Sequence, residues 1–481
     1  YIVRTISKVD ERLISGNVLS SEDYMIATNE KGEGFSKYGD IYINRFKKTN
    51  DEAQGIFFTI KNIQNKKIWS SNYSNNEPEA KYQISFMPDK NIQEITEGDI
   101  KTKIKTTIAS NEPVEIRRIT LENEGNNDEI LEVTAYFEPV LSKKEQDYAH
   151  PVFNNLFLKL NYDEETKSIV ATRNTRDEKE EKIYLYTTLS TNCEVTGDLE
   201  YEINEEKFLG RGNFKIPQMV EKSIPFSKKI GLVTEPIVAL KRTIKVPSKK
   251  KVTLDFILSV NNESQKAKEN LQKYLSYENV KTEFELSKAR VEAESRYLRV
   301  KGKEIEIYQK MMSYIIFDNP IKSMWMKANK KIKYKQSELW KFGISGDFPI
   351  ILVKIKDIND SYVIDEVLKA YEYLRTKGVF TELVIIDEEK HSYENYVKEE
   401  IEGSILNEQL GYLKNQRTGI FVLSKGEINK NDISIIEFVS SILIEAKNGG
   451  IENNIKEREE EYLEQYKQIG IEENNVNRLP D

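Results

Sequence analysis

The sequence has few of the residues that build disulfides, metal clusters and histidine-based active sites. Its 481 residues include one cysteine, Cys193, and two histidines, His150 and His391. A lone cysteine cannot close a disulfide within the chain or supply a cysteine cluster for a metal, and it is typical of a reducing compartment. Two histidines so far apart in sequence argue against a histidine-based triad or zinc site. We therefore expect no metal and no cofactor.

Long apolar runs, a leader segment and basic stretches are also absent. No uninterrupted apolar run approaches the roughly 20 residues that span a bilayer, and no charged and then apolar leader follows Tyr1. The 72 basic and 80 acidic side chains are mixed along the chain, with a net charge of −8, and offer no basic stripe to phosphates. We expect no nucleic-acid partner and no direct membrane insertion. The predicted location is the cytoplasm, or the cytoplasmic face of a membrane-anchored parent, and the missing initiator methionine predicts a piece of a longer protein.

What the sequence does contain is enough apolar surface for more than one core. Hydrophobic residues make up 38% against 32% charged, and 26 tyrosines and 19 phenylalanines supply large side chains. A chain of this length exceeds the size at which a single core stops growing. We therefore predict a folded, multidomain protein with two or three domains.

The first region, residues 1–262, is predicted to be a large antiparallel β-sandwich. From about Leu13 to Val260, short runs alternate apolar and polar residues with the period of two that half-buried strands show. One such run places on one face Val252, Leu254, Phe256, Leu258 and Val260. Turn-rich stretches separate the runs without intervening helices, which indicates stacked antiparallel sheets.

Beyond the sandwich the apolar period changes twice. Residues 263–333 show helical spacing and are predicted to be a helical linker, within which Pro320 stops the pattern because proline lacks the amide proton. Residues 334–450 alternate buried strand-like runs with helical stretches, which predicts a small α/β domain with parallel strands. Residues 451–481 are rich in Glu and Lys and are predicted to be a charged tail, either a solvated helix or a frayed end.

The segment 343–347 (GISGD) resembles a nucleophile elbow only superficially. Its serine is followed directly by glycine, and the sequence has almost no histidine to act as the base. Trp340 and two phenylalanines flank the small residues, which lets the backbone approach a neighbour or a sugar ring closely. Both a structural turn and a ligand site fit this pattern. For a ligand site the candidates are Trp340, Ser345 and Asp347.

The richest loop of the sandwich region spans residues 32–46. Aromatic faces pack on the C–H surfaces of sugars, and Asp and Arg bind hydroxyls through charge-assisted hydrogen bonds, so this mixture suits carbohydrate. No Gly-Lys-Ser/Thr ends its glycines and no strand-to-helix transition follows, which argues against a phosphate site. An ordinary exposed hairpin fits equally well. The candidate sugar-binding residues are Phe35, Ser36, Tyr38, Asp40 and Arg45.

Several segments together resemble one known family. Residues 34–46 resemble the glycine-aromatic-serine-basic element and the following Arg-aromatic pair of cyclic β-1,2-glucan synthases and, more loosely, of cellobiose-type phosphorylases of glycoside hydrolase family 94, formerly glycosyltransferase family 36. Similar segments follow in order at residues 149–157, 208–212, 339–350, 374–378 and 383–385, and residues 235–242 agree less strictly. Because the resemblance covers most of the chain in order, the chain is similar to the N-terminal region of this family, with its supersandwich fold.

The resemblance implies a parent enzyme that builds, cyclises or phosphorolyses β-1,2-linked glucan. In such parents the chemistry resides in an (α/α)₆ barrel with an aspartate as catalytic acid, and inorganic phosphate is the nucleophile where phosphorolysis occurs. The chain lacks the length and the helical pattern for this barrel after Pro349, so we expect the catalytic aspartate outside it. The implied function is a non-catalytic, carbohydrate-binding or scaffolding portion. Its implied partners are β-glucan and the C-terminal catalytic domain of the same parent.

Two other functions stay open on the sequence. In the first, the chain itself acts on glycosidic bonds as a phosphorylase or transglycosylase, with Asp347 as the acid or as a sugar ligand. In the second, it is a protein-interaction scaffold, since a sheet domain beside a barrel can bury the barrel's flank without contacting sugar.

Overall fold

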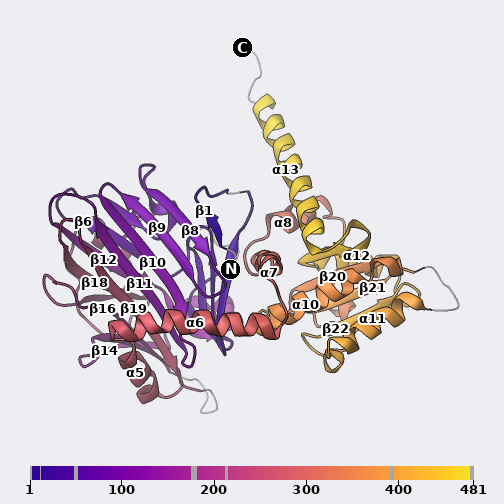
Figure 1. The fold of residues 1–481 in the computed structure, drawn as a ribbon, viewed down its shortest axis with the longest axis horizontal. Helices are drawn as coiled ribbons and strands as arrows, with labels where there is room; N and C mark the ends of the chain where they lie inside the picture. Colours follow the sequence, from indigo (N-terminus) through magenta and orange to yellow (C-terminus); the bar gives the residue numbers. More distant parts are fainter. Residues whose placement is uncertain are drawn as a thin grey trace. The chain divides into compact units, whose positions relative to one another are not determined.

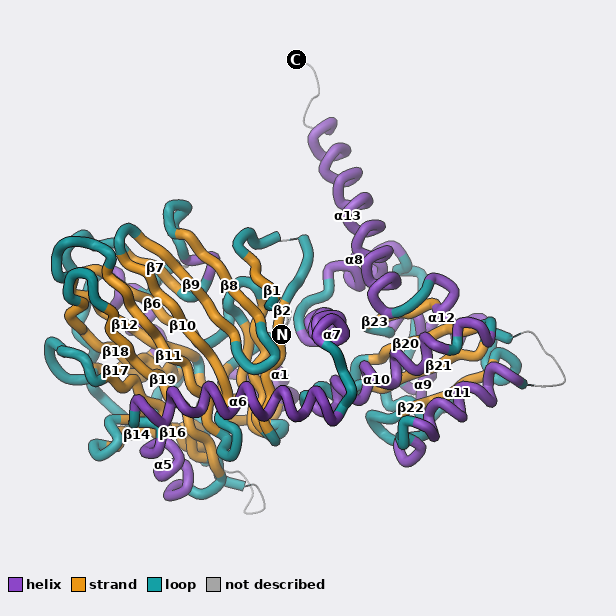
Figure 2. The backbone as a smooth tube through the Cα atoms, viewed as in Figure 1, coloured by secondary structure: helices purple, strands orange, loops and turns teal. Residues whose placement is uncertain are grey.

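The computed structural model divides the chain into two compact units (Figures 1 and 2). It describes residues 3–10, 12–47, 53–174, 181–211, 215–389 and 395–476. The first unit comprises Tyr1–Val9 and Gly16–Ser295, and the second comprises Asp10–Ser15 and Arg296–Asp481. The boundary falls near the C-terminal end of a long helix, so each unit takes part of the predicted helical linker.

Three antiparallel sheets form the first unit in the part of it that the structure describes. The nine-stranded sheet has the order β1 (Arg4–Ile6), β8 (Lys81–Phe86), β9 (Asn91–Glu97), β10 (Ile100–Ile108), β11 (Val114–Asn123), β19 (Lys251–Asn261), β16 (Tyr184–Thr191), β15 (Ser168–Arg173) and β14 (Leu158–Asp163). The β12 sheet has the order β17 (Glu200–Asn204), β18 (Pro236–Val246), β12 (Glu129–Phe137), β6 (Phe57–Asn62) and β7 (Ile68–Ser70). The β4 sheet has the order β13 (Pro139–Lys143), β5 (Ile41–Asn44), β4 (Gly34–Tyr38), β3 (Tyr24–Asn29) and β2 (Gly16–Ser21).

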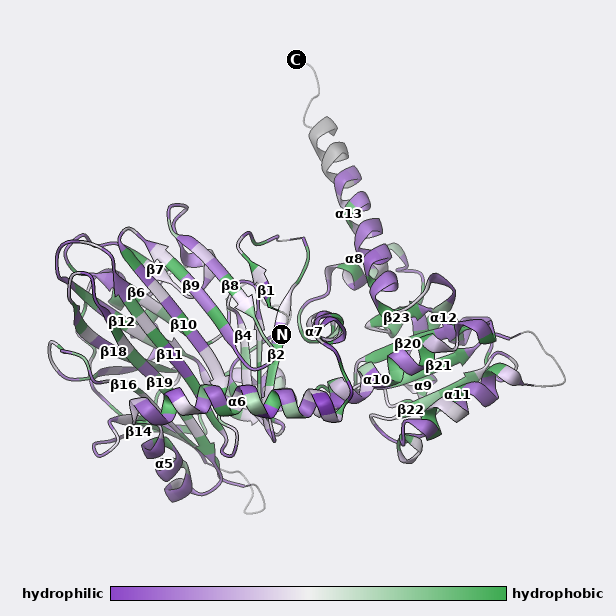
Figure 3. Ribbon diagram, viewed as in Figure 1, coloured by the Kyte–Doolittle hydropathy of each residue, from purple (hydrophilic) through white to green (hydrophobic). Residues whose placement is uncertain are grey.

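The alternation within the strands accounts for the core of the first unit. On β19, the side chains of Leu254, Phe256 and Leu258 are fully buried, and they share one apolar cluster with Tyr24 of β3 and Val133 of β12. Each such side chain stabilises the fold by about 1.5–3 kcal/mol relative to an exposed one. Figure 3 shows hydrophobic residues within the strands and hydrophilic ones along most loops. The structure thus confirms the predicted antiparallel sandwich.

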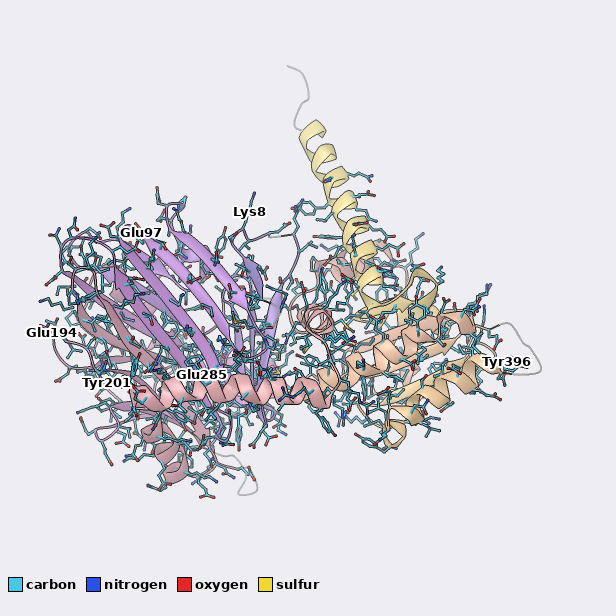
Figure 4. All side chains as sticks on the ribbon, in the orientation of Figure 1. Lys8, Glu97, Glu194, Tyr201, Glu285 and Tyr396 are labelled. Carbon is cyan, nitrogen blue, oxygen red and sulfur yellow. The ribbon has the colours of Figure 1, made fainter. Side chains whose placement is uncertain are left out.

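Helices cover the outer faces of two of these sheets. The helices α5 (Ser264–Lys273) and α6 (Tyr277–Tyr297) pack on the nine-stranded sheet through Leu271 and Val280, while Glu285 of α6 is exposed (Figure 4). The helices α3 (Glu205–Leu209) and α4 (Gln218–Glu221) cover the β12 sheet through Phe208 and Met219. Further short helices that connect strands are η1 (Tyr73–Asn75), α1 (Lys144–Ala149) and α2 (Pro151–Asn155).

The second unit is built around a parallel sheet, which has four strands in the described residues. Its order is β22 (Ile420–Ser424), β21 (Glu382–Asp387), β20 (Ile350–Ile355) and β23 (Ile442–Glu445). Its helices are α7 (Gly302–Ile316), α8 (Pro320–Ala328), α9 (Ser337–Trp340), η2 (Ile358–Asp360), α10 (Tyr362–Thr376), α11 (Tyr396–Asn407), η3 (Gly411–Leu413), α12 (Lys430–Val439), η4 (Ala446–Asn448) and α13 (Ile451–Val476). The chain winds outward from β20 to β22 and returns to the other side of β20, as in doubly wound α/β folds. This confirms the predicted small α/β domain with parallel strands.

The residues of the predicted charged tail form α13 as far as Val476. The start of this helix is packed, because Ile451 is fully buried and Ile455 and Tyr462 are nearly so. Of the two forms that the sequence allows, the structure has the helix, and its first turns pack on the second unit. Residues 477–481 lie outside the described part.

Candidate functional site

A groove of about 1150 Å³ opens at one end of the β12 sheet, in the first unit. The strand β12 ends there, and β6 and β18 begin there, because Tyr136 pairs antiparallel with both Phe57 and Ala239. The chain then turns at Glu138 and continues into β13 of the β4 sheet. The groove therefore lies where the chain leaves one sheet for the other.

The groove is lined by aromatic, amide and charged side chains. The aromatic and amide residues are Phe57, Tyr136, Phe137, Gln54, Asn72 and Asn75. The charged residues are Lys31, Glu33, Arg45, Glu138, Glu205, Glu206, Arg211, Lys215 and Glu235. One wall comes from the β3–β4 loop and η1, and the other from α3 and the residues that follow it.

Tyr136 lines the groove, and no described protein group forms a hydrogen bond with its hydroxyl. Its ring packs 5.9 Å from that of Phe57 and 5.1 Å from that of Phe208, centroid to centroid, and only 8% of the residue is exposed. Burial raises the pKa of Tyr136, so the hydroxyl stays protonated and can both donate and accept. A buried polar group is normally paired, and here a water or a ligand hydroxyl in the groove can pair it.

Arg45 lies at the margin of the groove, but most of its guanidinium binds the protein itself. Nε and Nη2 donate to the Asp147 carboxylate at 3.0 and 2.8 Å, and Nη1 donates to Glu138 at 3.1 Å. Nη2 also donates to Asn155 Oδ1 at 2.8 Å. Burial acts to lower the pKa of Arg45, but the hydrogen bonds and charges of Asp147 and Glu138 raise it overall. Arg45 thus fixes α1 and α2 beside β5, and one of its five N–H groups has no partner among the described residues and can bind a ligand.

The opposite wall is a short helical segment anchored to the β12 sheet. The side chain of Asn204 caps α3 by accepting a backbone N–H at 2.9 Å, and Phe208 of this helix is fully buried. Lys61 of β6 donates from the sheet to the carbonyls of Val220 and Glu221, at 3.0 and 2.6 Å. A cation at the C-terminal end of α4 satisfies carbonyls that have no partner within the helix.

Phe35 and Ser36, two of the predicted sugar-binding residues, are part of the core. They are 5% and 0% exposed. The Ser36 hydroxyl donates to the Glu115 carboxylate at 2.5 Å, and Arg117 Nε donates to the same carboxylate at 2.6 Å. The expectation of a sugar contact at these two positions is corrected, because β4 is the middle strand of its sheet and both residues are covered.

The other predicted loop residues differ in their surroundings. Tyr38 is half-buried, and the exposed Asp40 pairs with Lys143 at 2.7 Å. Neither belongs to the lining of the groove, whereas Arg45 does. A sugar contact at Tyr38 or Asp40 stays a prediction, and Arg45 is the residue of the predicted set that the structure brings to the groove.

The three candidates from the predicted α/β domain, Trp340, Ser345 and Asp347, lie together on the second unit. Trp340 is 61% exposed, and its indole N–H donates to the carbonyl of Ser345 at 3.2 Å. The Ser345 hydroxyl accepts the backbone N–H of Asp347 at 3.1 Å. Asp347 accepts from Gln336 at 2.8 Å. The segment is therefore a tight turn with an exposed tryptophan beside it.

Sequence reasoning does not single out Tyr136, Asn75 or Glu138. Tyr136 occupies a polar-phase position of an alternating run, so its spacing alone predicts a solvent-facing side chain. Asn75 falls in a stretch that predicts an ordinary turn. The groove joins segments about 200 residues apart, from Lys31 to Glu235. No local sequence pattern predicts that these segments lie close together. Gly212, within one of the segments with family resemblance, lies outside the described residues.

Comparison with known proteins decides the family. The family model for glycosyl hydrolase 94, supersandwich domain, matches residues 1–277, more than half of the chain. The chain belongs to glycoside hydrolase family 94. The match includes every described strand of the first unit, so the groove lies within the family's supersandwich domain.

A relative of this family 94 chain is the cyclic β-(1,2)-glucan synthase NdvB of Rhizobium meliloti (strain 1021). It is 26% identical over 444 residues, which are 91% of this chain and 16% of the relative. The chain therefore spans about a sixth of the length of that relative. Solved structures that match in part are a bacterial glucoamylase complexed with acarbose (10% identity, TM-score 0.39, 78% of this chain and 53% of that one) and a polysaccharide lyase (15%, 0.31, 53% and 34%).

In the described part of the chain, no helix is both long and apolar enough to cross a membrane. The same part also contains no group of three or more Asp, Glu, His or Cys side chains placed to hold a metal ion. The cytoplasmic location stays a prediction.

Proposed function

We propose that this family 94 chain binds a β-linked glucan, with 1,2-linked glucan as the preferred ligand, in the groove of its first unit. It does so as a non-catalytic part of a glucan-processing enzyme. The observation that carries the proposal is Tyr136 on the lining of a large groove, with a hydroxyl that no group among the described residues pairs. Membership of family 94 and the identity to a cyclic β-(1,2)-glucan synthase support the choice of ligand.

The charges of the groove favour a neutral ligand rich in hydroxyls over an anion. The five carboxylates of the lining face four cations, and several of these charges are already paired. Arg45 binds Glu138 at 3.1 Å, and Arg211 binds Glu206 at 2.6 Å. Paired charges leave little net field for a phosphate, but their remaining lone pairs and N–H groups bind hydroxyls well. Asn75 adds a neutral amide.

We place glycosidic chemistry in another domain of the parent enzyme. Cleavage of a glycosidic bond needs a carboxylic acid whose pKa is raised, so that it can protonate the leaving group. Among the described residues, burial raises the pKa of four carboxyls, all outside the groove: Asp255, Glu366, Glu372 and Asp387. Asp255 is held by Arg118 at 2.8 Å, and the other three belong to the second unit. Inorganic phosphate is then a co-substrate of the parent where the reaction is phosphorolysis.

Isothermal titration of the full chain with β-1,2-glucooligosaccharides tests the groove. Tyr136→Phe removes only the hydroxyl, and the loss of one hydrogen bond worth about 0.5–1.5 kcal/mol raises Kd about two- to twelvefold. Tyr162→Phe is the matched control, because its ring stacks on Tyr201 at 4.4 Å and does not line the groove. No binding up to millimolar glucan, or equal affinity in wild type and Tyr136→Phe, rejects the proposal.

The non-catalytic part of the proposal has its own assay. Asp347 is the alternative acid, and its side chain is 54% exposed and lies 3.6 Å from Arg417. We expect no product when the purified chain is incubated with β-1,2-glucooligosaccharides and phosphate. Product formation by the wild type that Asp347→Asn abolishes would overturn the non-catalytic role. It would not affect the proposal that the groove binds glucan.

A second candidate function is docking of another domain beside the groove. An apolar patch on α2 and the loop before β18 is exposed by 46–69% in each of Val152, Phe153, Leu156, Ile230 and Leu232. The two segments are adjacent, since the side-chain amide of Asn155 in α2 donates to the carbonyl of Thr234 in the loop before β18 at 3.3 Å. Large exposed apolar patches mark protein contacts. We propose the catalytic domain of the parent as the partner, tested by co-purification with the remainder of the parent polypeptide, which Leu156→Asp should weaken and Glu285→Lys should not.

A further inference from the structure

We propose that the second unit carries a separate carbohydrate-binding surface, here called the aromatic strip. It is formed by Trp340, Phe348 and Phe380 with the polar side chains between them. The proposal rests on the proposed function only in its choice of ligand, a neutral β-linked glucan. The strip and the groove belong to different units, so each can be tested without the other.

The topology of the parallel sheet gathers the strip at one edge. Phe348 lies two residues before the start of β20, and Phe380 lies two residues before the start of β21. Arg417 precedes β22 by three residues. Because these three strands are parallel neighbours, their amino ends lie side by side. The backbone N–H of Ser345 donates to Glu382 at 3.2 Å and so ties the turn beside Trp340 to the same edge.

A chain of contacts shows that the members of the strip are contiguous. Gln336 donates to Asp347 at 2.8 Å and to the carbonyl of Ser345 at 2.9 Å, the carbonyl that also accepts the Trp340 indole N–H. Asp347 lies 3.6 Å from Arg417. The Arg417 guanidinium lies 5.0 Å from the centroid of the Phe348 ring.

The contacts continue toward Phe380. The side chain of Arg375 donates to the hydroxyl of Thr418, the residue after Arg417, at 3.0 Å. The same guanidinium lies 5.2 Å from the centroid of the Phe380 ring. Phe380 is 43% exposed. The strip therefore runs from an exposed tryptophan, across an Asp–Arg pair and a hydroxyl, to an exposed phenylalanine.

This alternation matches a sugar chain better than a protein surface. The exposed ring of Trp340 is held by the hydrogen bond of its indole N–H, so little rotamer freedom is lost when a sugar packs on it. Polar groups interrupt the aromatics at each step, whereas the centre of a protein interface is a continuous apolar cluster. The Asp347–Arg417 pair can bind neighbouring hydroxyls without a net charge.

The opposite edge of the sheet, where doubly wound folds commonly bind ligands, is filled by the protein's own charges. The amino end of α13 would suit an anion, but the Glu366 carboxylate already accepts the backbone N–H of Ile451 there at 3.3 Å. Lys354, at the end of β20, lies between the carboxylates of Glu437 and Glu445, at 2.7 and 3.4 Å. That edge also has exposed aromatic side chains, Tyr362 and Tyr396, which are 54% and 50% exposed at the starts of α10 and α11. The connected series of aromatic and polar contacts described above belongs to the amino edge.

Fluorine NMR of the full chain labelled with 5-fluorotryptophan tests the strip at one residue. The chain has three tryptophans, and the resonance of Trp340 is assigned by its loss in Trp340→Phe. We expect β-1,2-glucooligosaccharides to shift this resonance and to leave that of Trp69, which is 1% exposed, in place. Phe380→Ala should raise the midpoint of the shift about two- to tenfold, by loss of one aromatic contact. Arg417→Gln provides a second variant that keeps the aromatic residues.

The groove variant separates the two proposals. Tyr136→Phe should weaken the calorimetric binding at the groove and leave the midpoint of the Trp340 shift unchanged. A Trp340 resonance that does not respond to glucan, while the groove still binds, overturns the strip alone, and so does a response that Phe380→Ala and Arg417→Gln leave unaltered. A response that Tyr136→Phe alters as much as Phe380→Ala also overturns it, because the shift then reports the groove.

Discussion

Replacing Arg45 by methionine distinguishes a structural role of this side chain from the sugar contact that the sequence predicts. Arg45 and Asp147 are 12% and 5% exposed and are joined by two hydrogen bonds of 3.0 and 2.8 Å. Arg45→Met leaves the buried Asp147 carboxylate without its cation. Breaking a buried pair in this way destabilises a fold by about 3–5 kcal/mol. With a urea m-value near 3 kcal/mol/M, the midpoint of unfolding of the first unit should fall by about 1–1.7 M.

The double variant Arg45→Met/Asp147→Leu supplies the internal control. It removes both charges, so it should be more stable than Arg45→Met although it carries one more substitution, with a coupling energy of about 2 kcal/mol or more. Both variants lose the hydrogen bond from Arg45 to Asn155, so this loss cancels when the two are compared.

The assay reads the first unit alone. In a background with Trp325 and Trp340 replaced by phenylalanine, Trp69 is the remaining tryptophan. It is buried, and its indole N–H donates to Thr102 of β10 at 2.8 Å, so its fluorescence reports the sandwich. An unchanged midpoint in Arg45→Met, together with loss of glucan binding, would refute the structural reasoning and restore Arg45 as a sugar ligand.

Two further predictions concern a backbone position and a titrating group. Gly34 has φ 153°, and a Cβ there would lie 1.9 Å from the carbonyl oxygen of Ala27. Gly34→Ala should therefore destabilise the first unit by about 1–3 kcal/mol or more, measured by the fluorescence of Trp69 during unfolding. An unchanged midpoint of unfolding contradicts this prediction. Burial raises the pKa of Glu366, so the folded second unit binds that proton more tightly than the unfolded chain, and the stability contributed by this group falls as pH rises above the ordinary value of about 4.3. Relative to wild type, Glu366→Gln should therefore gain Tm between pH 4 and 7, and a difference that stays constant with pH rejects the assignment.

The architecture was predictable because its signals are local. The alternation of Leu254, Phe256 and Leu258 needs one buried face and one polar face, and β19 has both. The continuous apolar run at Ile350–Val353 predicts a strand covered on both faces, which the parallel sheet provides. Neither prediction requires knowledge of the residues that pack against the strand.

The site was not predictable to the same degree, because its residues are defined by partners far away in sequence. Ser36 and Glu115 are 79 residues apart, and only their pairing shows that an aromatic and polar stretch belongs to the core. The alternating pattern predicts that Tyr136 faces solvent, but α3 covers its strand in the structure. That no described group pairs its hydroxyl follows only from the three-dimensional arrangement of its neighbours. The Trp340 turn was found from the sequence since its members lie within a few residues of one another.

Buried cationic side chains anchor both walls of the groove, and this anchoring affects the affinity of the groove for glucan. Arg45 ties one margin to α1 and α2, and Lys61 ties the other to the end of α4. If the walls are ordered before binding, the binding free energy does not include the cost of ordering them, which is about 0.5–1.5 kcal/mol for each mobile side chain. Lys61→Met should therefore weaken glucan binding although Lys61 does not line the groove, because α4 would lose the cation on its terminal carbonyls. Equal affinity in Lys61→Met and wild type would show that the second wall needs no such anchor and that the groove is shaped by apolar packing around Phe208 alone.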